Sequence, residues 1–257
     1  MNMLTAAAIE TQLHTRRFGH PLRLVAETDS TNRLAREWAA AGAPEGAAVA
    51  ADRQTAGRGR RGRAFFSPAG GVYLSVVLRP QAGVDPGWIT SCAAVAVARA
   101  IERFASFPVQ IKWVNDLLIR GKKVCGILTE GELDAGTGAL RYAVLGIGIN
   151  VGAAEFPAPL GAIATSLANE GCAVERERLI AAVLEEWERA YTHIADGAFL
   201  EESRRRSAVL GKTVTVLRGE ERFGAVAQAI DPQGHLVVQT ADGRTLTLQS
   251  GEVSLKL

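Results

Sequence analysis

The feature that most constrains the fold of this 257-residue chain is a change of pattern near residue 210. Up to about Arg206, short apolar runs typical of strands alternate with longer segments of helical periodicity, which indicates a domain built from both. After Leu210 the chain holds only short strand candidates separated by turn residues. We therefore predict a domain of helices and strands over residues 1–209 and a small β-barrel over residues 210–257.

Individual elements of the first domain can be read from periodicity and bounding residues. Residues 72–78 form a mostly apolar run between two glycines and a proline, which is typical of a buried strand. Residues 175–196 carry one apolar stripe and stop at Gly197, as an amphipathic helix does. Residues 120–122 have the chemistry of a hairpin turn. On the same grounds we expect helices at 33–41 and 89–104 and strands at 109–113, 117–119, 124–128 and 142–151.

The tail is divided into five strand candidates, and its charges balance. It contains five basic and five acidic residues, which argues against binding nucleic acid through charge. Five short strands in so little chain predict a small barrel. The candidates are residues 213–217, 223–230, 235–240, 244–248 and 253–257.

Overall composition limits the class of function. The 29 Lys and Arg residues nearly balance 27 Asp and Glu residues, so any anion-binding site must be local. Three cysteines (Cys92, Cys125 and Cys172) are too few for a disulfide framework and predict a cytoplasmic protein. No apolar window is long enough for a membrane helix, and the first residues do not form a signal peptide, so we expect no membrane partner. The four histidines lie far apart and predict no metal site.

The most informative segment is residues 54–63, in which four arginines and three glycines occupy the last seven positions. Guanidinium groups bind phosphate oxygens in pairs, and glycines allow backbone N–H groups to approach a ligand closely. Such a segment is too charged to be buried and too flexible to order alone. The pattern favours a small phosphate-bearing ligand, with a solvated basic loop and an RNA-binding segment as alternatives.

Two further motifs carry polar groups at strand ends. In residues 112–116, Asn115 and Asp116 place an amide and a carboxylate at a rim that suits magnesium or a ribose hydroxyl, although Asn-Asp is also common in turns. Lys123 begins the returning strand of the hairpin and could reach the same rim. In residues 146–150, two glycines within a strand indicate close approach of a ligand or another backbone, with Asn150 as a polar group beside it.

Ser30 has no nearby histidine or nucleophile-elbow context, so its default role is to cap the helix expected at 33–41. Taken together, however, five motifs resemble those of the biotin protein ligases in residue identity, order and spacing. They are residues 29–32, 54–63, 112–116, Lys123 with Gly126, and 146–151. The resemblance covers about residues 20–257. It implies an α+β fold, with a mixed-sheet catalytic domain of the biotin/lipoate-ligase type followed by a small SH3-like barrel.

The resemblance also implies a reaction. Biotin and Mg-ATP would give biotinyl-5′-AMP, whose acyl group then passes to a lysine of a biotin carboxyl-carrier domain of a carboxylase. The groups implied to be catalytic are Lys123, Arg60 and Asp116, and Mg²⁺ would arrive with ATP, with Asn115 and Asp116 as candidate ligands.

Binding roles follow from motif position. Ser30, Thr31, Asn32 and Gln54 would contact the ureido ring of biotin, and the arginine loop would order on the ligand and close over it. The implied contacts to biotin or the adenylate are Ser30, Thr31, Asn32, Gln54, Gly57, Arg58, Gly59, Arg60, Lys123 and Gly126, and those to the nucleotide are Arg61, Arg63, Phe65, Asn115 and Asn150.

Three departures from the family pattern stand out. Val114 replaces a proline, and Phe65 replaces a tryptophan that often follows the loop. Only about 20 residues precede the first expected strand, so we expect a monofunctional form that binds no DNA operator. Two alternatives stay open: a related lipoate or octanoate ligase or transferase, and a nucleic-acid-binding module that uses the arginine loop.

Overall fold

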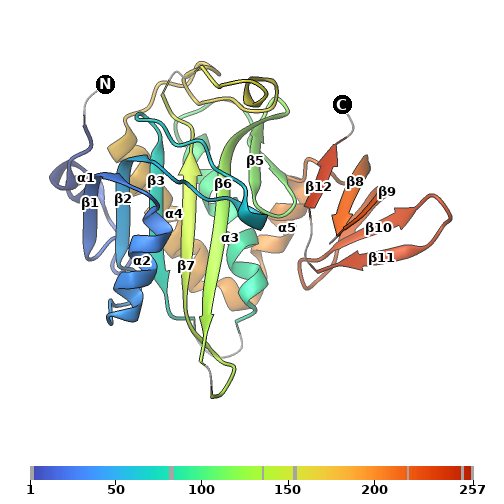
Figure 1. The fold of residues 1–257 in the computed structure, drawn as a ribbon, viewed down its shortest axis with the longest axis horizontal. Coiled ribbons are helices and arrows are strands. Elements are labelled where there is room, and N and C mark those ends of the chain that lie inside the picture. The colour runs from blue at the N-terminus through green and yellow to red at the C-terminus, as the bar shows by residue number, and fades with distance from the viewer. Residues whose placement is uncertain are drawn as a thin grey trace.

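Seven strands of the computed structural model form one mixed sheet at the centre of the larger unit (Figure 1). The structure describes residues 3–80, 84–134, 136–152, 155–218, 220–249 and 252–255. The first two strands pair in parallel and every other neighbouring pair is antiparallel, which confirms the expected mixed sheet. In sheet order the strands are β1 (Leu22–Thr28), β2 (Ala48–Gln54), β3 (Val72–Leu78), β7 (Leu140–Ile149), β6 (Lys122–Leu133), β5 (Asp116–Ile119) and β4 (Gln110–Lys112).

Helices cover both faces of this sheet, and the two-residue alternation of the strands decides which helix takes which face. Val49 and Val77 pack with helix α2 (Thr31–Ala40), whereas their neighbours Ala48 and Val76 belong to the core shared with the other helices. Figure 1 shows α2 in front of the sheet and the other long helices behind it. The long helices are α3 (Pro86–Glu102) and α4 (Arg176–Thr192), and the short helices α1 (Ala6–Gln12) and α5 (Phe199–Arg205) contribute side chains to the same core.

The expected elements are confirmed, with small shifts at their ends. Helix α3 begins before residue 89, because Asp85 accepts a hydrogen bond from the N–H of Gly87 and Pro86 occupies the first turn. Helix α4 ends at Thr192, and a short 3₁₀ turn then leads to Gly197, which takes the left-handed conformation. Within the described residues, no helix is long and apolar enough to cross a membrane.

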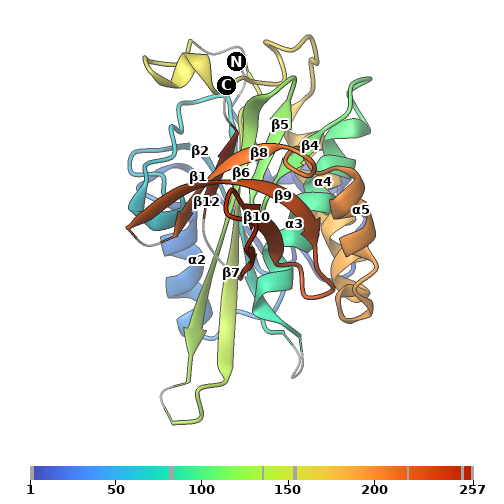
Figure 2. The ribbon, with the colours of Figure 1, turned by 90° about the vertical axis from the view of Figure 1, so that its right-hand side faces the viewer.

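The tail forms a second, antiparallel sheet around its own apolar core, in agreement with the expected small barrel (Figure 2). All five expected strands are present, although the last two residues of the fifth candidate lie outside the described part of the chain. The strands are β8 (Thr213–Arg218), β9 (Glu221–Ile230), β10 (Leu236–Thr240), β11 (Thr245–Leu248) and β12 (Glu252–Leu255), in the order β11-β10-β9-β8-β12.

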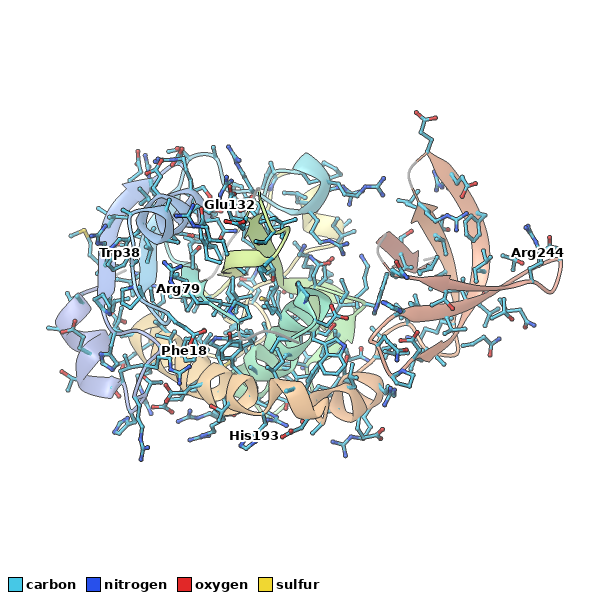
Figure 3. All side chains as sticks on the ribbon, turned by 90° about the horizontal axis from the view of Figure 1, so that it is seen from below. Phe18, Trp38, Arg79, Glu132, His193 and Arg244 are labelled. Carbon is cyan, nitrogen blue, oxygen red and sulfur yellow. The ribbon has the colours of Figure 1, made fainter. Side chains whose placement is uncertain are left out.

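Two tryptophans of the larger unit hold the tail against it. The indole N–H of Trp113 donates to the carbonyl of Gly234 at 3.0 Å, and its ring belongs to the apolar core of the tail. The indole N–H of Trp88 donates to the carbonyl of Gln233 at 2.9 Å. Seen from below, the tail extends away from the larger unit, with Arg244 at its far end and His193 on the outer side of α4 (Figure 3).

Candidate active site

A cavity lies over the central strands β6 and β7, where four separate parts of the chain meet. The start of α2, the end of β2, the arginine loop and the β5–β6 hairpin each contribute side chains. It gathers most of the residues singled out from the sequence. Its lining consists of Ser30, Thr31, Asn32, Gln54, Arg58, Gly59, Arg60, Phe65, Asn115, Lys123, Gly126, Ile127, Leu128, Gly146, Ile147 and Gly148.

One wall of the cavity is a network of neutral hydrogen bonds. Parallel pairing of β1 with β2 sets Thr28 beside Gln54, so the end of β2 lies next to the start of α2. The Oε1 atom of Gln54 accepts from the backbone N–H of Thr31 at 2.8 Å and lies 3.0 Å from the Thr31 hydroxyl. The amide nitrogen of Gln54 donates to Ser67 at 3.0 Å. These partners fix the orientation of the Gln54 amide before any ligand arrives.

Asn32 extends this wall across the sheet, and Gly146 makes room for it. A Cβ atom at Gly146 would overlap the Oδ1 atom of Asn32. That Oδ1 lies 2.6 Å from the hydroxyl of Ser75, and Nδ2 donates to the carboxylate of Glu130 at 2.8 Å. Only 5% of Asn32 is exposed. The side chain is therefore held from three directions.

Ser30 stands at the N-cap of α2, but its side chain makes no capping hydrogen bond, so the expected capping role is wrong. Gln54 accepts the Thr31 N–H instead, and the hydroxyl of Ser30 faces the cavity lining. The N–H of Ser30 donates to Asp29 at 2.7 Å. The hydrogen bond from the Arg33 guanidinium is the main cause that lowers the pKa of Asp29 to about 2.

Strand glycines leave space in the floor of the cavity, as the sequence indicated, but side chains rather than a backbone fill it. Gly126 and Gly148 pair across β6 and β7. A Cβ atom at Gly148 would lie 2.5 Å from the ring of Phe65, and one at Gly126 would lie 3.1 Å from that ring. The ring of Phe65 therefore packs against both glycines, and a side chain at either position would disturb this packing.

The arginine loop forms a small hairpin, and the expectation that it orders on the ligand stays a prediction. The N–H of Phe65 donates to Gly57 and that of Gly59 donates to Arg63, at 2.8 and 2.7 Å, and residues 60–62 form a 3₁₀ turn. Ser67 and Phe65 leave no room for a side chain at Gly57, which packs behind the cavity instead of lining it. In Figure 1 the loop crosses in front of β7 and β6 toward the tail. Main-chain bonds and the ring of Phe65 hold the two sides of this hairpin together.

The four arginines of the loop differ in where they point. Arg58 and Arg60 belong to the cavity lining, and Arg60 donates to Asn115 Oδ1 at 3.2 Å. Arg61 donates instead to the carbonyl of Leu217 in the tail, at 3.4 Å. Arg63 is exposed and outside the lining. The structure thus brings two of the four predicted cationic groups to the site.

Lys123 and Asp116 form an ion pair at the opposite corner of the cavity. The β5–β6 hairpin brings Lys123 Nζ to 2.5 Å from Asp116 Oδ1, while Lys112 Nζ lies 3.5 Å from Oδ2. One third of the Lys123 side chain is exposed, against 16% for Asp116. Lys123 therefore faces the cavity, and Asp116 is its less exposed counterion.

The expected magnesium ligands do not fit a cation in this arrangement. Two ammonium groups flank the carboxylate of Asp116, and a guanidinium donates to the amide oxygen of Asn115. The oxygen atoms that a hard cation requires are thus already directed at positive groups. Across the part of the chain that the structure describes, no cluster of three or more His, Cys, Asp or Glu could hold a metal ion. We derive no step through these residues and a metal.

Asn150 does not reach the cavity. Its amide nitrogen donates to the carbonyl of Thr165 at 2.9 Å, and its backbone bonds to Val124 and Leu167. These contacts fasten the end of β7 to the segment after it. All three cysteines are buried and unpaired, and burial raises the pKa of their thiols, so none is a reactive thiolate.

Sequence reasoning missed the residues that support the wall from behind. Ser75 is fully buried in β3, and its hydroxyl lies within hydrogen-bond distance of both Thr31 and Asn32. Glu130 in β6 accepts from Asn32. A serine in the middle of an otherwise apolar strand was a detectable signal, because buried hydroxyl groups need partners.

Comparison with known proteins agrees with this geometry. Residues 24–150 match the Biotin/lipoate A/B protein ligase family, and residues 209–256 match the Biotin protein ligase C terminal domain. The bifunctional ligase/repressor BirA of Bacillus subtilis is 38% identical over 250 residues, which are 93% of this chain and 76% of BirA. The chain belongs to the biotin protein ligase family.

Other members of the family align with a similar share of the chain. The biotin–[acetyl-CoA-carboxylase] ligase of Mycobacterium tuberculosis is 35% identical over 251 residues, which are 90% of this chain and 88% of the relative. The structure of the biotin protein ligase from Aquifex aeolicus in complex with biotin and ATP superimposes with a TM-score of 0.80 at 30% identity, over 94% of this chain and 99% of that one. Val114 and Phe65 are the two positions that depart from the family pattern. Val114 packs beside the tail core, and Phe65 keeps an aromatic ring over the glycine floor.

Proposed function

We propose that the chain is an ATP-dependent, AMP-forming biotin ligase that activates biotin and transfers it to a lysine of a carboxylase biotin-carrier domain. The observation that carries this proposal is the division of the cavity into a buried neutral wall and a cationic end. A cyclic urea needs neutral donors and acceptors, and a carboxylate that meets a phosphate needs positive charge. Relatives that cover nearly the whole chain are named as ligases of this type.

Biotin recognition falls to the neutral wall. Ser30, Thr31, Asn32 and Gln54 offer hydroxyl and amide groups at the cavity surface, with partners behind them that fix their direction. A ureido ring carries two N–H donors and one carbonyl acceptor, which such a wall can match. Buried groups that are already oriented lose little entropy when the ligand binds.

Adenylation falls to the cationic end. The carboxylate oxygen of biotin attacks the α-phosphorus of ATP, the bond to the β-phosphate oxygen breaks, and pyrophosphate leaves. Lys123 and Arg60 neutralise the negative charge that accumulates on the α-phosphate oxygens, with Arg58 and Gly59 on the loop side. Asp116 holds the Lys123 ammonium in place. No protein nucleophile is needed, because positioning and charge account for the step.

Transfer completes the reaction. The amine of the acceptor lysine attacks the acyl carbon of biotinyl-5′-AMP, an amide bond forms, and AMP leaves with the electron pair of the broken C–O bond. Phe65 and Asn115 line the cavity and would contact the nucleotide. Arg61, Arg63, Asn150 and Gly57 would serve this site from outside its lining, by shaping the loop and the end of β7.

Two accompanying proposals concern organisation. We place the domain boundary near residues 209–210, in the segment that joins α5 to β8. Three unpaired buried cysteines suit a reducing compartment, and we propose the cytoplasm.

The function is tested with purified protein by biotin-dependent exchange of labelled pyrophosphate into ATP, and by transfer of biotin to a carboxylase carrier domain. Both should occur, and both should require Mg-ATP. Lipoate and octanoate in parallel reactions test the acyl group, and exchange that prefers lipoate would overturn the choice of biotin. Single-stranded RNA at low and high salt tests the arginine loop as a nucleic-acid site.

A further inference from the structure

Behind the neutral wall, a chain of hydrogen bonds ends on a charged group that does not line the cavity. It runs from Gln54 through Thr31, Ser75 and Asn32 to the carboxylate of Glu130. Ser75 is fully buried, and Thr31 and Asn32 are 4% and 5% exposed. This chain of hydrogen bonds crosses from α2 over β3 to β6. It therefore connects elements that are far apart in sequence.

The carboxylate decides which way the amide of Asn32 faces. An ionised carboxylate can only accept hydrogen bonds, and so can the carbonyl of Leu128. Both lie on the same side of Asn32, at 2.8 and 3.3 Å from its Nδ2 atom. The amide nitrogen must therefore point toward them, and Oδ1 must point toward Ser75.

The direction of Asn32 then fixes the hydroxyl protons of the wall. Asn32 Oδ1 has no proton, so the 2.6 Å contact with Ser75 requires the single hydroxyl proton of Ser75. The proton of Thr31 is left to bond either Ser75 Oγ, 2.8 Å away, or Gln54 Oε1, 3.0 Å away. In both cases it stays within the wall, and the Thr31 oxygen can only accept from the cavity side.

Glu130 is also paired with a guanidinium group of α2. Arg36, one turn along α2 from Asn32, brings a guanidinium nitrogen to 3.6 Å from Glu130 Oε1. The other carboxylate oxygen faces Asn32. About a quarter of the Glu130 side chain is exposed. The ion pair and the amide thus use different oxygen atoms.

We propose that Glu130 is a positioning residue, which sets the direction of this hydrogen-bond chain so that Thr31 presents an acceptor to an N–H donor of the bound substrate. The proposal rests on the proposed function, since the ureido ring of biotin supplies such an N–H group. Glu130 acts through Asn32 and Ser75 and touches no substrate.

The test is a double-mutant cycle on biotin affinity, with Glu130→Gln and Ser75→Ala alone and together. A glutamine can turn either its oxygen or its nitrogen toward Asn32, so only the longer bond to the Leu128 carbonyl still directs the Asn32 amide. Glu130→Gln should raise the KM for biotin about fivefold while leaving the KM for ATP and the melting temperature unchanged. In the Ser75→Ala background the same change should have less than a twofold effect, because the connection is already cut.

Two control variants separate this role from charge and packing. Glu132→Gln alters an exposed carboxylate two residues along the same strand and should leave the KM for biotin unchanged. Arg36→Gln removes the ion pair but keeps the carboxylate, and should change the KM for biotin less than Glu130→Gln does.

The outcomes separate the two proposals. Additive effects of Glu130→Gln and Ser75→Ala, or a parallel rise in the KM for ATP, would mean that Glu130 supports the structure without directing the chain. An unchanged KM for biotin in Glu130→Gln would also overturn the role. Absence of biotin-dependent exchange in the unaltered protein would instead refute the proposed function, and would leave the hydrogen-bond geometry to be probed with another cyclic urea.

Discussion

The two sides of the cavity are built on opposite principles. The wall around Thr31 and Asn32 is almost fully buried, neutral, and bonded to groups behind it. The arginine loop places Arg58, Arg61 and Arg63 in solvent, and its order depends on a few main-chain bonds and one aromatic ring. One side is thus held by many buried hydrogen bonds, and the other by few contacts at the surface.

This difference matters because the two ends of the proposed intermediate make different demands. A neutral ring is distinguished by directional hydrogen bonds, and buried polar groups enforce direction because an unpaired one costs about 1–3 kcal/mol. A phosphate is held by charge, which tolerates small displacements but weakens as salt rises. Substitutions in the wall should therefore alter selectivity for the acyl group, and substitutions in the loop should alter retention of the adenylate.

The largest effect is expected at Lys123, where the two sides meet. Lys123→Ala should reduce pyrophosphate exchange by about a hundredfold or more, since a positive group aimed at developing charge contributes on that scale. The melting temperature should change little, because the side chain is one-third exposed and Lys112 still faces Asp116.

Lys122→Ala is the matched control for that variant. Lys122 is the neighbouring lysine of the same hairpin and is exposed, so its removal should leave exchange intact. Equal losses in both variants would show that general positive charge, and not the placement of Lys123, supports adenylation.

Gly146→Ala should have the next largest effect and should act on the wall alone. The added methyl group would overlap Asn32 Oδ1, and Asn32 has little freedom because Ser75 and Glu130 hold it. Losing about 2 kcal/mol of oriented bonding would raise the KM for biotin about thirtyfold. Steady-state kinetics at saturating ATP measure it. Gly224→Ala, in an open strand position, is the control.

If Gly146→Ala left biotin binding unchanged, the wall would be more adaptable than its hydrogen bonds suggest. A comparable rise in the KM for ATP would show that the disturbance reaches the cationic end. The wall would then not act on biotin binding alone.

The sequence was most informative where local chemistry decides the outcome. Apolar periodicity located the strands, and turn residues located their ends, so the two-part fold followed. The glycines at 146 and 148 and the arginines at 58 and 60 were recognisable as site residues because their types are unusual in such places. In each case a few neighbouring residues contain the whole signal.

Residues defined by distant partners were not recoverable in this way. Nothing near Ser75 reveals that Thr31 and Asn32 lie beside it, 44 and 43 positions away. Arg61 and Arg60 are adjacent and chemically identical, yet the tail draws one of them to Leu217. Trp113 follows a strand of the larger unit, but its ring completes the core of the tail. Tertiary contact decides all three, and a single sequence does not contain it.

Arg60→Ala should have a smaller effect, confined to the loop side. Loss of one charge-assisted hydrogen bond should speed release of biotinyl-5′-AMP about tenfold, with the KM for biotin nearly unchanged. The difference from the unaltered protein should shrink in high salt. Rapid dilution of the preformed adenylate complex measures release. Arg63→Ala, outside the cavity lining, should change release less than twofold, and similar rates for the two variants would favour bulk charge.

The smallest effect concerns the turn that leads into the wall. Hydrogen bonding to Arg33 lowers the pKa of Asp29 from 3.8 to about 2, so the folded state favours the ionised form. The resulting stabilisation is present above pH 3.8 and is lost as the pH falls toward 2. Because Asp29 and Arg33 are each 40% exposed, solvent screening should keep it small.

Urea unfolding of the unaltered protein and of Asp29→Asn measures this contribution. The free energies of unfolding of these two proteins should differ at pH 7 and converge near pH 2. The difference between the unaltered protein and Arg33→Gln should vary with pH in the same way, because the guanidinium is the main cause of the lowered pKa. A difference that persists unchanged down to pH 2 would mean that Asp29 acts as a neutral acceptor for the N–H of Ser30. The start of α2 would then be held by the same uncharged bonding that links Gln54, Thr31 and Ser75 in the wall it supports.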